Sequence, residues 1–173
     1  MSFLTLVWLV WLSFVVHELE EWKITEFERR NFEGFPATAT ARSAHGWIAF
    51  ICTVGLVWCA AATFPGNLTF AAYLFLPALV LMLLNALQHV YWSLLFRQYA
   101  PGVITAVVLL IPLTVYLIMQ AALRAYVSRW YIAMLMAGLV FGFVHTAVTG
   151  KHTSPAIHAI YRIGSGVAEK FTQ

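Results

Sequence analysis

Long apolar segments alternate with short polar stretches along the whole chain. Five such segments cover residues 2–22, 44–64, 68–96, 103–123 and 130–148. A helix needs about 20 mostly apolar residues to cross the hydrocarbon layer of a membrane. No internal repeat relates the segments to one another. The pattern predicts an all-α fold, an integral membrane helical bundle of about five transmembrane helices.

The first segment ends in polar residues that its length draws into the membrane. Its purely apolar part, residues 2–16, would form roughly 22 Å of helix, whereas the hydrocarbon layer is about 30 Å thick. We therefore expect the helix to continue through His17 to Trp22. A basic start and a small-residue cleavage site are both lacking, so we expect a membrane helix here and not a signal peptide.

The connections and the tail carry clear turn signals. Tight turns are predicted at residues 65–67, 99–102 and 124–129, and helix kinks at Pro77 and Pro112. Residues 23–43 are predicted to start as a helical extension that stops before Gly34 and to end as a solvated loop.

The expected organisation is a five-span membrane domain over residues 1–150, followed by a cytoplasmic or interfacial tail over residues 151–173. Within the tail, a helix is predicted to start at Ser154-Pro155 and to be interrupted at Gly164-Ser165-Gly166.

Composition supports the membrane assignment. The chain is 62% hydrophobic with a mean hydropathy of +0.82, and 10% of its residues are charged, against about 25% in soluble domains. Cys52 and Cys59 are predicted to be buried free thiols. No basic patch with interleaved aromatic residues occurs, so we expect no nucleic-acid partner. The sequence does not predict an oligomeric state.

The distribution of basic residues predicts an orientation. Of the ten Lys and Arg residues, only Arg124 and Arg129 fall on the side of the N-terminus, and the other eight fall on the opposite side. By the positive-inside rule that second side is cytoplasmic. We expect an integral protein of the cell inner membrane, with its N-terminus outside.

Alternating helix directions bring several histidines to one end of the bundle. The first, third and fifth segments run in the same direction, so His17, His89 and His145 are all expected near their cytoplasmic ends. His45 opens the second segment at that end, where it is either a site residue or an interface anchor. Ionisable groups at membrane depth are costly and indicate function.

Helical spacing selects the faces. Glu20 and Glu21 lie three and four residues after His17 and are predicted to share its face, whereas Glu18 points elsewhere. Asn85 and His89 also lie four residues apart. Gly138 and Gly142 have the spacing of a close-packing helix face, which predicts that His145, three residues later, faces the bundle interior.

Imidazole nitrogen and carboxylate oxygen suit a divalent metal, Zn or Fe. The predicted metal ligands are listed here in chain order: His17, Glu21, His89 and His145. Glu20 would be the acid or base, and Asn85 would orient a ligand or donate to a developing oxyanion. Tyr99 would reach the mouth of the site.

Three motifs together resemble the HXXEE family of small membrane proteins, to which no function is assigned. They are H-x-x-E-E at residues 17–21, N-x-x-x-H at 85–89 and Y-x-P-G at 99–102. The resemblance covers roughly residues 10–150. It implies that the motif residues matter, including Pro101 and Gly102, and it supplies no reaction.

The favoured hypothesis is a metal-dependent enzyme that acts on a lipid or another amphiphile from the cytoplasmic leaflet. Zn would support hydrolysis or proton transfer, and Fe would support oxidation with an added electron donor. The alternatives are a protein that binds or transports a metal ion or protons, and a non-catalytic interaction protein with a buried polar network.

Overall fold

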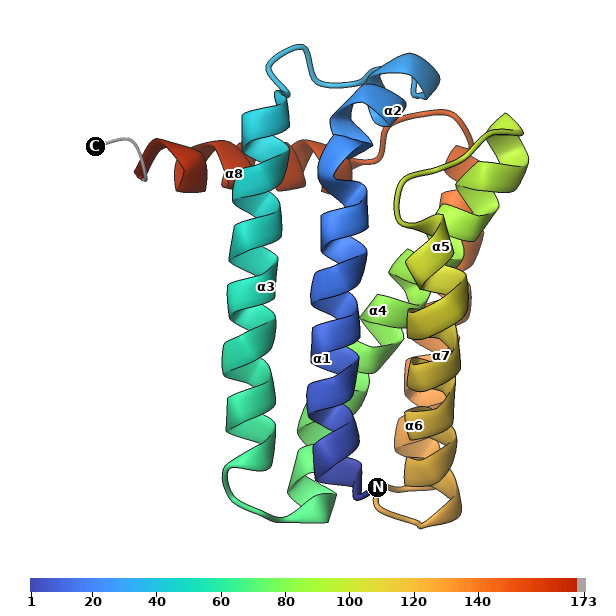
Figure 1. Cartoon of the computed structure of the whole chain (residues 1–173). Coiled ribbons are helices and arrows are strands. Elements are labelled where there is room, and N and C mark those ends of the chain that lie inside the picture. Colours follow the sequence, from blue (N-terminus) through green and yellow to red (C-terminus); the bar gives the residue numbers. More distant parts are fainter. Residues whose placement is uncertain (171–173) are drawn as a thin grey trace.

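The computed structural model describes residues 1–170, which fold into helices joined by short loops (Figure 1). The elements are α1 (Phe3–Glu20), η1 (Glu21–Lys23), α2 (Ile24–Asn31), α3 (Ala41–Thr63), α4 (Leu68–Phe96), α5 (Val103–Thr105), η2 (Ala106–Leu110), α6 (Ile111–Leu123), α7 (Arg129–Thr149) and α8 (Pro155–Lys170). Within these residues there is no strand, only one bridge between Glu33 and His152. Five helical segments are long and apolar enough to cross a membrane, which confirms the all-α membrane fold.

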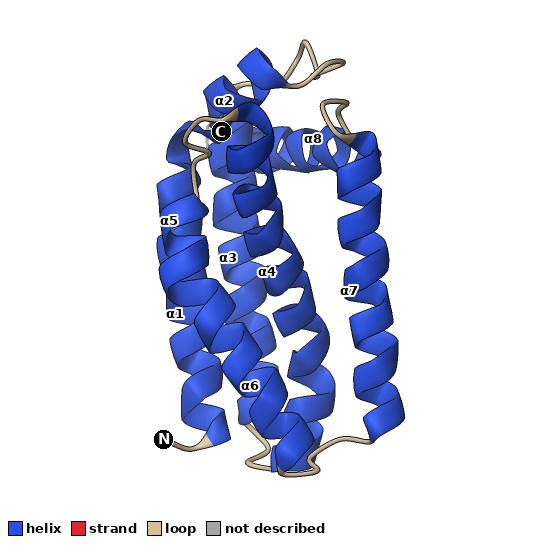
Figure 2. Ribbon diagram, turned by 90° about the vertical axis from the view of Figure 1, so that its right-hand side faces the viewer, coloured by secondary structure: helices blue, strands red, loops and turns tan. Residues whose placement is uncertain are grey.

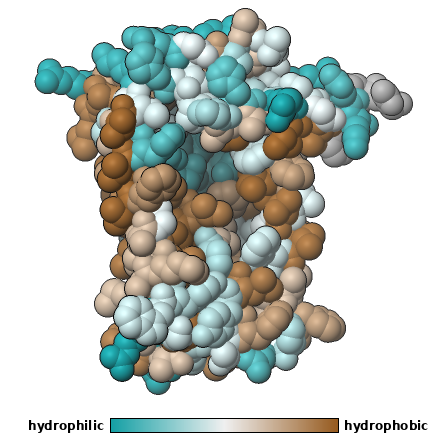
Figure 3. Space-filling model, turned by 180° about the vertical axis from the view of Figure 1, so that it is seen from behind, coloured by the Kyte–Doolittle hydropathy of each residue, from teal (hydrophilic) through white to brown (hydrophobic). Residues whose placement is uncertain are grey.

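The long helices run along a common axis, and α8 lies across them at the end opposite the N-terminus (Figure 1). The main core lies between α1, α4, η2 and α6, where Val10, Leu79 and Leu110 are fully buried. Helix α7 stands at the edge of the bundle (Figure 2), and most of its side chains are exposed. Polar residues gather at the α8 end above a more apolar face that is hollowed between the helices (Figure 3).

The first span continues past its apolar part, as its length requires. Helix α1 passes through the tight turn η1 directly into α2, so the helical span is Phe3–Asn31. The chain then leaves the helix before Gly34, whose φ of +75° favours glycine. Residues His17 to Trp22 therefore lie within a helical span, as predicted.

Both predicted proline positions fall in helices. Pro77 lies inside α4, and Pro112 opens α6 directly after η2, a turn of π-helix. A π turn widens the helix, so it accommodates a proline that lacks the backbone N–H of a regular turn. The π turn begins immediately after Thr105, a residue of the candidate site.

The predicted interruption of the tail helix is wrong. Helix α8 runs without a break through Gly164 to Lys170. A Cβ atom at Gly164 would overlap the backbone oxygen of Ser43, and one at Gly46 would overlap the backbone oxygen of Gly164. These glycines serve close packing of α8 on α3, because only residues without a side chain let two helix backbones approach so closely.

Candidate functional site

Three side chains from two helical spans converge in the interior. His17 of α1, Glu21 of η1 and His89 of α4 each offer one ligand atom, and these atoms all lie within 4.8 Å of one another. Oε1 of Glu21 lies 2.9 Å from Nε2 of His17 and 2.9 Å from Nε2 of His89. Both imidazoles are buried, and the Glu21 side chain is 12% exposed. The predicted convergence of the first and third segments is confirmed for these residues.

The two short contacts of Glu21 do not have the direction of hydrogen bonds. Oε1 of Glu21 and both ring nitrogens of His89 are buried without a hydrogen-bond partner among the described residues. Buried polar atoms of this kind are rare, and each needs a physical explanation such as a bound ion. The three side chains point their ligand atoms at a shared centre, an arrangement that can hold a divalent cation.

Asn85 adds an oxygen at the same place. It lies one helical turn before His89 on α4, and its Oδ1 is 2.8 Å from Nε2 of His17. The spacing of four residues puts both side chains on one face of the helix, as the sequence predicts. Asn85 therefore stands beside the convergent ligand atoms, in a position to add a further oxygen or to orient a group bound there.

Glu20 is not one of the three convergent ligand residues, and its carboxylate is held by the start of α5. Its carboxylate accepts hydrogen bonds from the backbone N–H groups of Ile104 (3.1 Å) and Thr105 (2.8 Å). The hydroxyls of Thr105 and Tyr99 also donate to it, the latter at 2.6 Å. A carboxylate with this many donors is an anchor that fixes the chain after the 99–102 turn. Burial, followed by the bond to Glu20, raises the pKa of Tyr99 to about 12, so its hydroxyl is a donor at neutral pH.

The Thr105 side chain contacts both Glu20 and His17 and so links the two residues. Its single hydroxyl proton goes to the Glu20 carboxylate, and its Oγ1 also lies 2.9 Å from Nδ1 of His17. The hydroxyl oxygen must then accept a hydrogen bond from Nδ1–H. In this tautomer of the neutral imidazole, Nε2 of His17 presents a lone pair toward Glu21, whereas the other tautomer donates Nε2–H to Oδ1 of Asn85. A second partner that fixes the ring in this way is typical of metal-ligating histidines.

Gly102 closes the cluster on its remaining side. Its φ is +94°, and a Cβ atom there would lie 2.9 Å from Cε1 of His17, 3.0 Å from Nδ1 of His89 and 3.1 Å from Cγ of Glu21. The 99–102 turn is confirmed by the bond from Val103 N to Ala100 O. Its glycine is needed both for the backbone conformation and for the space beside the ligands.

Two other predicted histidines lie outside the cluster. His145 is exposed on α7, so the prediction that it faces the bundle interior is wrong. Of the two glycines behind that prediction, only Gly142 meets a neighbouring helix, at Leu84, and nothing lies within 4 Å of Gly138. His45 stacks on Trp22 with ring centroids 3.7 Å apart and packs α3 against the end of the first span.

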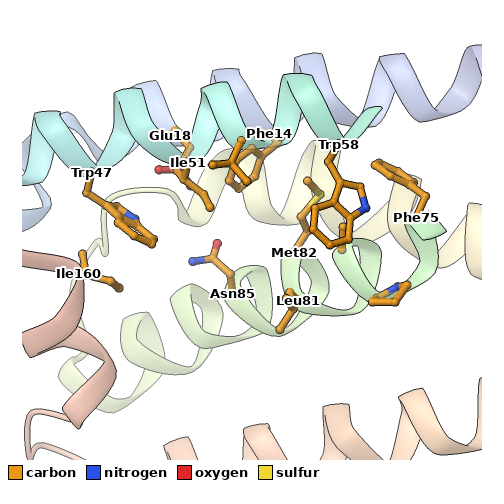
Figure 4. Close-up of a pocket in the computed structure, with 14 residues that line it drawn as sticks. Phe14, Glu18, Trp47, Ile51, Trp58, Phe75, Leu81, Met82, Asn85 and Ile160 are labelled. Carbon is orange, nitrogen blue, oxygen red and sulfur yellow. The ribbon is translucent and has the colours of Figure 1, made fainter. Parts of the chain in front are cut away.

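Glu18 is a residue that the sequence reasoning set aside and that the structure brings into the interior. It is 4% exposed and lines an apolar cavity of about 410 Å³ between α1, α3 and α4 (Figure 4). Among the described residues no hydrogen bond or ion pair reaches its carboxyl group. Trp47 and Asn85 line the same cavity. Exposed Leu81 and Trp58 place its mouth on the outer surface of the bundle.

A smaller chamber beside the cluster shares lining residues with this cavity. Its volume is about 130 Å³, and Glu21 and His89 line it together with Glu18 and Asn85. Glu18 and Asn85 line both the apolar cavity and the small chamber. A molecule in the apolar cavity therefore lies next to the groups that surround the convergent ligand atoms.

Helix α8 covers the small chamber from the end of the bundle. The Tyr161 hydroxyl donates to buried Glu28 of α2 at 2.6 Å. Burial, followed by the nearby Glu28 carboxyl, raises the pKa of Tyr161. The charged stretch after the first span is therefore only partly solvated, because Glu28 points inward and links the tail to the site.

The three sequence motifs meet at this one site. His17 and Glu21 come from the first motif, Asn85 and His89 from the second, and Gly102 from the third. The family described as "protein of unknown function with HXXEE motif" matches residues 8–117, which is more than half of the chain. The chain is a member of the HXXEE family.

For this HXXEE protein, comparisons with curated proteins and with solved structures find no match. The residues matched to the family include the whole cluster, the Glu20 anchor and most of the apolar cavity. Helices α7 and α8 follow the matched region.

Proposed function

We propose that this HXXEE protein is a metal-dependent integral membrane enzyme that acts on a lipid or another amphiphilic molecule. The observation that carries the proposal is the convergence of Nε2 of His17, Nε2 of His89 and Oε1 of Glu21 without hydrogen bonds among them. Electron-rich atoms at such short separations repel one another unless a proton or a metal cation lies between them. A divalent metal satisfies all three atoms at once.

Two imidazoles and one carboxylate suit Zn or Fe. Neighbouring ligand atoms of a metal bound at about 2.0–2.1 Å are roughly 2.9–3.4 Å apart, depending on the geometry. The separations of 2.9 Å from Glu21 to each histidine agree with that range. A metal held by three side chains keeps positions open, and with Zn it would activate a water or polarise a substrate oxygen. Asn85 stands ready to take one position or to orient the substrate.

The substrate class follows from the neighbouring cavity. Its lining is almost entirely apolar, and its mouth lies at exposed apolar side chains of the spanning helices, which in our proposal face the hydrocarbon of the membrane. Pockets that bury a ligand of lipid or drug size have volumes of roughly 300–1,000 Å³. A substrate would enter sideways from the bilayer and present its polar end to the small chamber. We place this entry in the cytoplasmic leaflet, following the distribution of Lys and Arg.

The test is a lipid turnover experiment with purified protein in nanodiscs that contain a total membrane lipid extract. Metal-loaded wild type is compared with wild type treated with a chelator and with His89→Ala, and the lipids are profiled by mass spectrometry. We expect at least one lipid to be consumed only by the metal-loaded wild type. The variant His45→Ala, which changes a histidine outside the cluster, should retain turnover. Equal lipid profiles in all samples would contradict an enzymatic role.

A second candidate function is supported by the row of carboxyl groups along the chamber. Glu18, Glu21 and Glu28 all line it, and chains of acids between membrane helices are typical of proteins that move protons or metal ions. Proteoliposomes loaded with a pH-sensitive or zinc-sensitive dye distinguish this function. Flux that is lost in His89→Ala, without any change in lipids, would favour the carrier over the enzyme.

A further inference from the structure

We infer that the apolar cavity binds an amphiphile whose polar end is a positively charged amine, and that Glu18 is the residue that recognises it. The inference rests on the proposed function, because it names the substrate class of the same site. Its first support is the state of Glu18 itself. The side chain is 4% exposed, and its carboxyl has no hydrogen bond or ion pair among the described residues. An unpaired carboxylate is costly in apolar surroundings, and a bound ammonium group would supply its partner.

The charges around both spaces point to the same ligand. No Lys or Arg lines the apolar cavity or the small chamber. Of the other acids in the chamber, Glu21 belongs to the cluster and Glu28 accepts a hydrogen bond from Tyr161. Of these three acids, Glu18 is the one left without a hydrogen bond or ion pair among the residues that the structure describes. An anionic headgroup would meet carboxylates and no cation there, whereas an ammonium group would meet a complementary charge.

The residue types that line the cavity also suit an amphiphilic amine. Trp47 lines both spaces, and the Trp58 ring lies further along the apolar cavity (Figure 4). The face of an indole ring attracts a cation, so Trp47 and Glu18 together form an aromatic and acidic site for an ammonium group. The remaining lining residues are apolar and would surround an alkyl chain. The amine would then lie beside Asn85, at the border with the small chamber.

The test measures binding of three probes with the same chain length: dodecylamine, dodecanol and dodecanoic acid. Each is titrated against detergent-solubilised full-length protein, both metal-loaded and chelator-treated, with native mass spectrometry as the readout. The measured quantity is the ratio of Kd in Glu18→Gln to Kd in wild type for each probe, which cancels differences in partition into detergent. Glu26→Gln, at an exposed acid in the first turn of α2, is the matched control.

We expect the ratio to be at least tenfold for dodecylamine and close to one for dodecanol, with no change for either probe in Glu26→Gln. Leu81→Trp, which narrows the exposed mouth of the cavity, should weaken binding of both probes. Equal ratios for amine and alcohol, preferential binding of dodecanoic acid, or unchanged binding in Leu81→Trp would each overturn the inference. Glu18→Gln should keep its metal. A metal-loaded, active wild type without any preference for dodecylamine would refute this inference alone, and amine binding by a metal-free, inactive wild type would refute only the proposed function.

Discussion

Replacing Gly102 with alanine tests whether the 99–102 turn and the ligand cluster form one packed unit. The new Cβ atom would lie 2.9 Å from Cε1 of His17, 3.0 Å from Nδ1 of His89 and 3.1 Å from Cγ of Glu21. Each distance is shorter than ordinary van der Waals contact, and all three neighbours belong to the cluster. Cε1 of His17 lies between the two ring nitrogens, so any shift of the ring moves both Nε2, the proposed metal ligand, and the contact of Nδ1 with Thr105.

The magnitude has two parts. A side chain at a φ of +94° costs about 1–2 kcal/mol of strain. Insertion of a methyl group into a packed interior adds about 1–3 kcal/mol. The expected loss in unfolding free energy is therefore about 2–5 kcal/mol. Metal affinity should fall by about 10–100-fold, the usual consequence of disturbing the residues that hold metal ligands in place.

Alanine substitutions at two other glycines separate the backbone strain from the packing contribution. Gly34 and Gly66 also have positive φ values, +75° and +67°, and nothing lies within 4 Å of a Cβ atom at either position. Gly34→Ala and Gly66→Ala should therefore show only the strain, with unchanged metal affinity. The assay is thermal unfolding in detergent together with metal titration. Equal stability losses in all three variants, with full metal binding in Gly102→Ala, would refute the packing of Gly102 against the ligands.

Three further substitutions test other contacts of the site. Thr105→Val removes the hydroxyl that contacts His17 and should weaken metal binding by about 10–100-fold, with recovery in Thr105→Ser. The control Thr114→Val, at a buried threonine whose hydroxyl bonds to backbone oxygens, should bind metal normally. Equal metal affinity in the two valine variants would contradict the role of Thr105. Gly164→Ala should detach α8 from α3 and expose the tail to limited proteolysis, because its Cβ atom would overlap the backbone of Ser43. Gly166→Ala should leave the tail protected, because nothing lies within 4 Å of a Cβ atom there. Equal protection from proteolysis in the two variants would disprove the close contact of α8 with α3. Tyr161→Phe should lower the unfolding free energy by about 1–3 kcal/mol by leaving Glu28 buried without its donor. The control is Tyr126→Phe, at a half-buried tyrosine whose hydroxyl makes no hydrogen bond among the described residues. A loss no larger than in that control would show that the bond to Glu28 does not stabilise the fold.

The helices and part of the site follow from the sequence because their physical causes are local. Length and hydropathy define the spans, and a spacing of four residues pairs His17 with Glu21 and Asn85 with His89. Alternating helix direction brings the first and third spans to the same depth. These rules suffice to predict the cluster that the structure shows.

The remaining features depend on which helices pack together, and the spacing of residues does not determine that. His145 was predicted inside on the basis of Gly138 and Gly142, yet α7 packs at the edge of the bundle and leaves that histidine exposed. Glu18 was placed outside the site because it does not share a face with His17, although a third helix covers that other face and buries it. Glu20 was predicted as an acid or base, which stays a prediction, and sequence spacing did not indicate that its carboxylate would accept hydrogen bonds from the start of α5.

The Gly164 packing shows the same limit. A glycine pair within an amphipathic tail is equally typical of a break and of a close helix contact, and only the position of α3 decides between them. Thr105 carried a weak signal, a polar residue three positions after Gly102 at the start of an apolar segment. Its role became visible only with the distances to Glu20 and His17.

The central claim is a metal ion held by His17, His89 and Glu21, and metal analysis of protein purified without a histidine tag tests it most directly. We expect about one equivalent of Zn or Fe per chain, lost in His17→Ala and His89→Ala and retained in His45→Ala and His145→Ala. X-ray absorption of the wild type should show nitrogen and oxygen ligands at about 2.0–2.2 Å with two imidazoles. A folded protein that binds no divalent metal, or an equal loss in all four variants, would contradict the account.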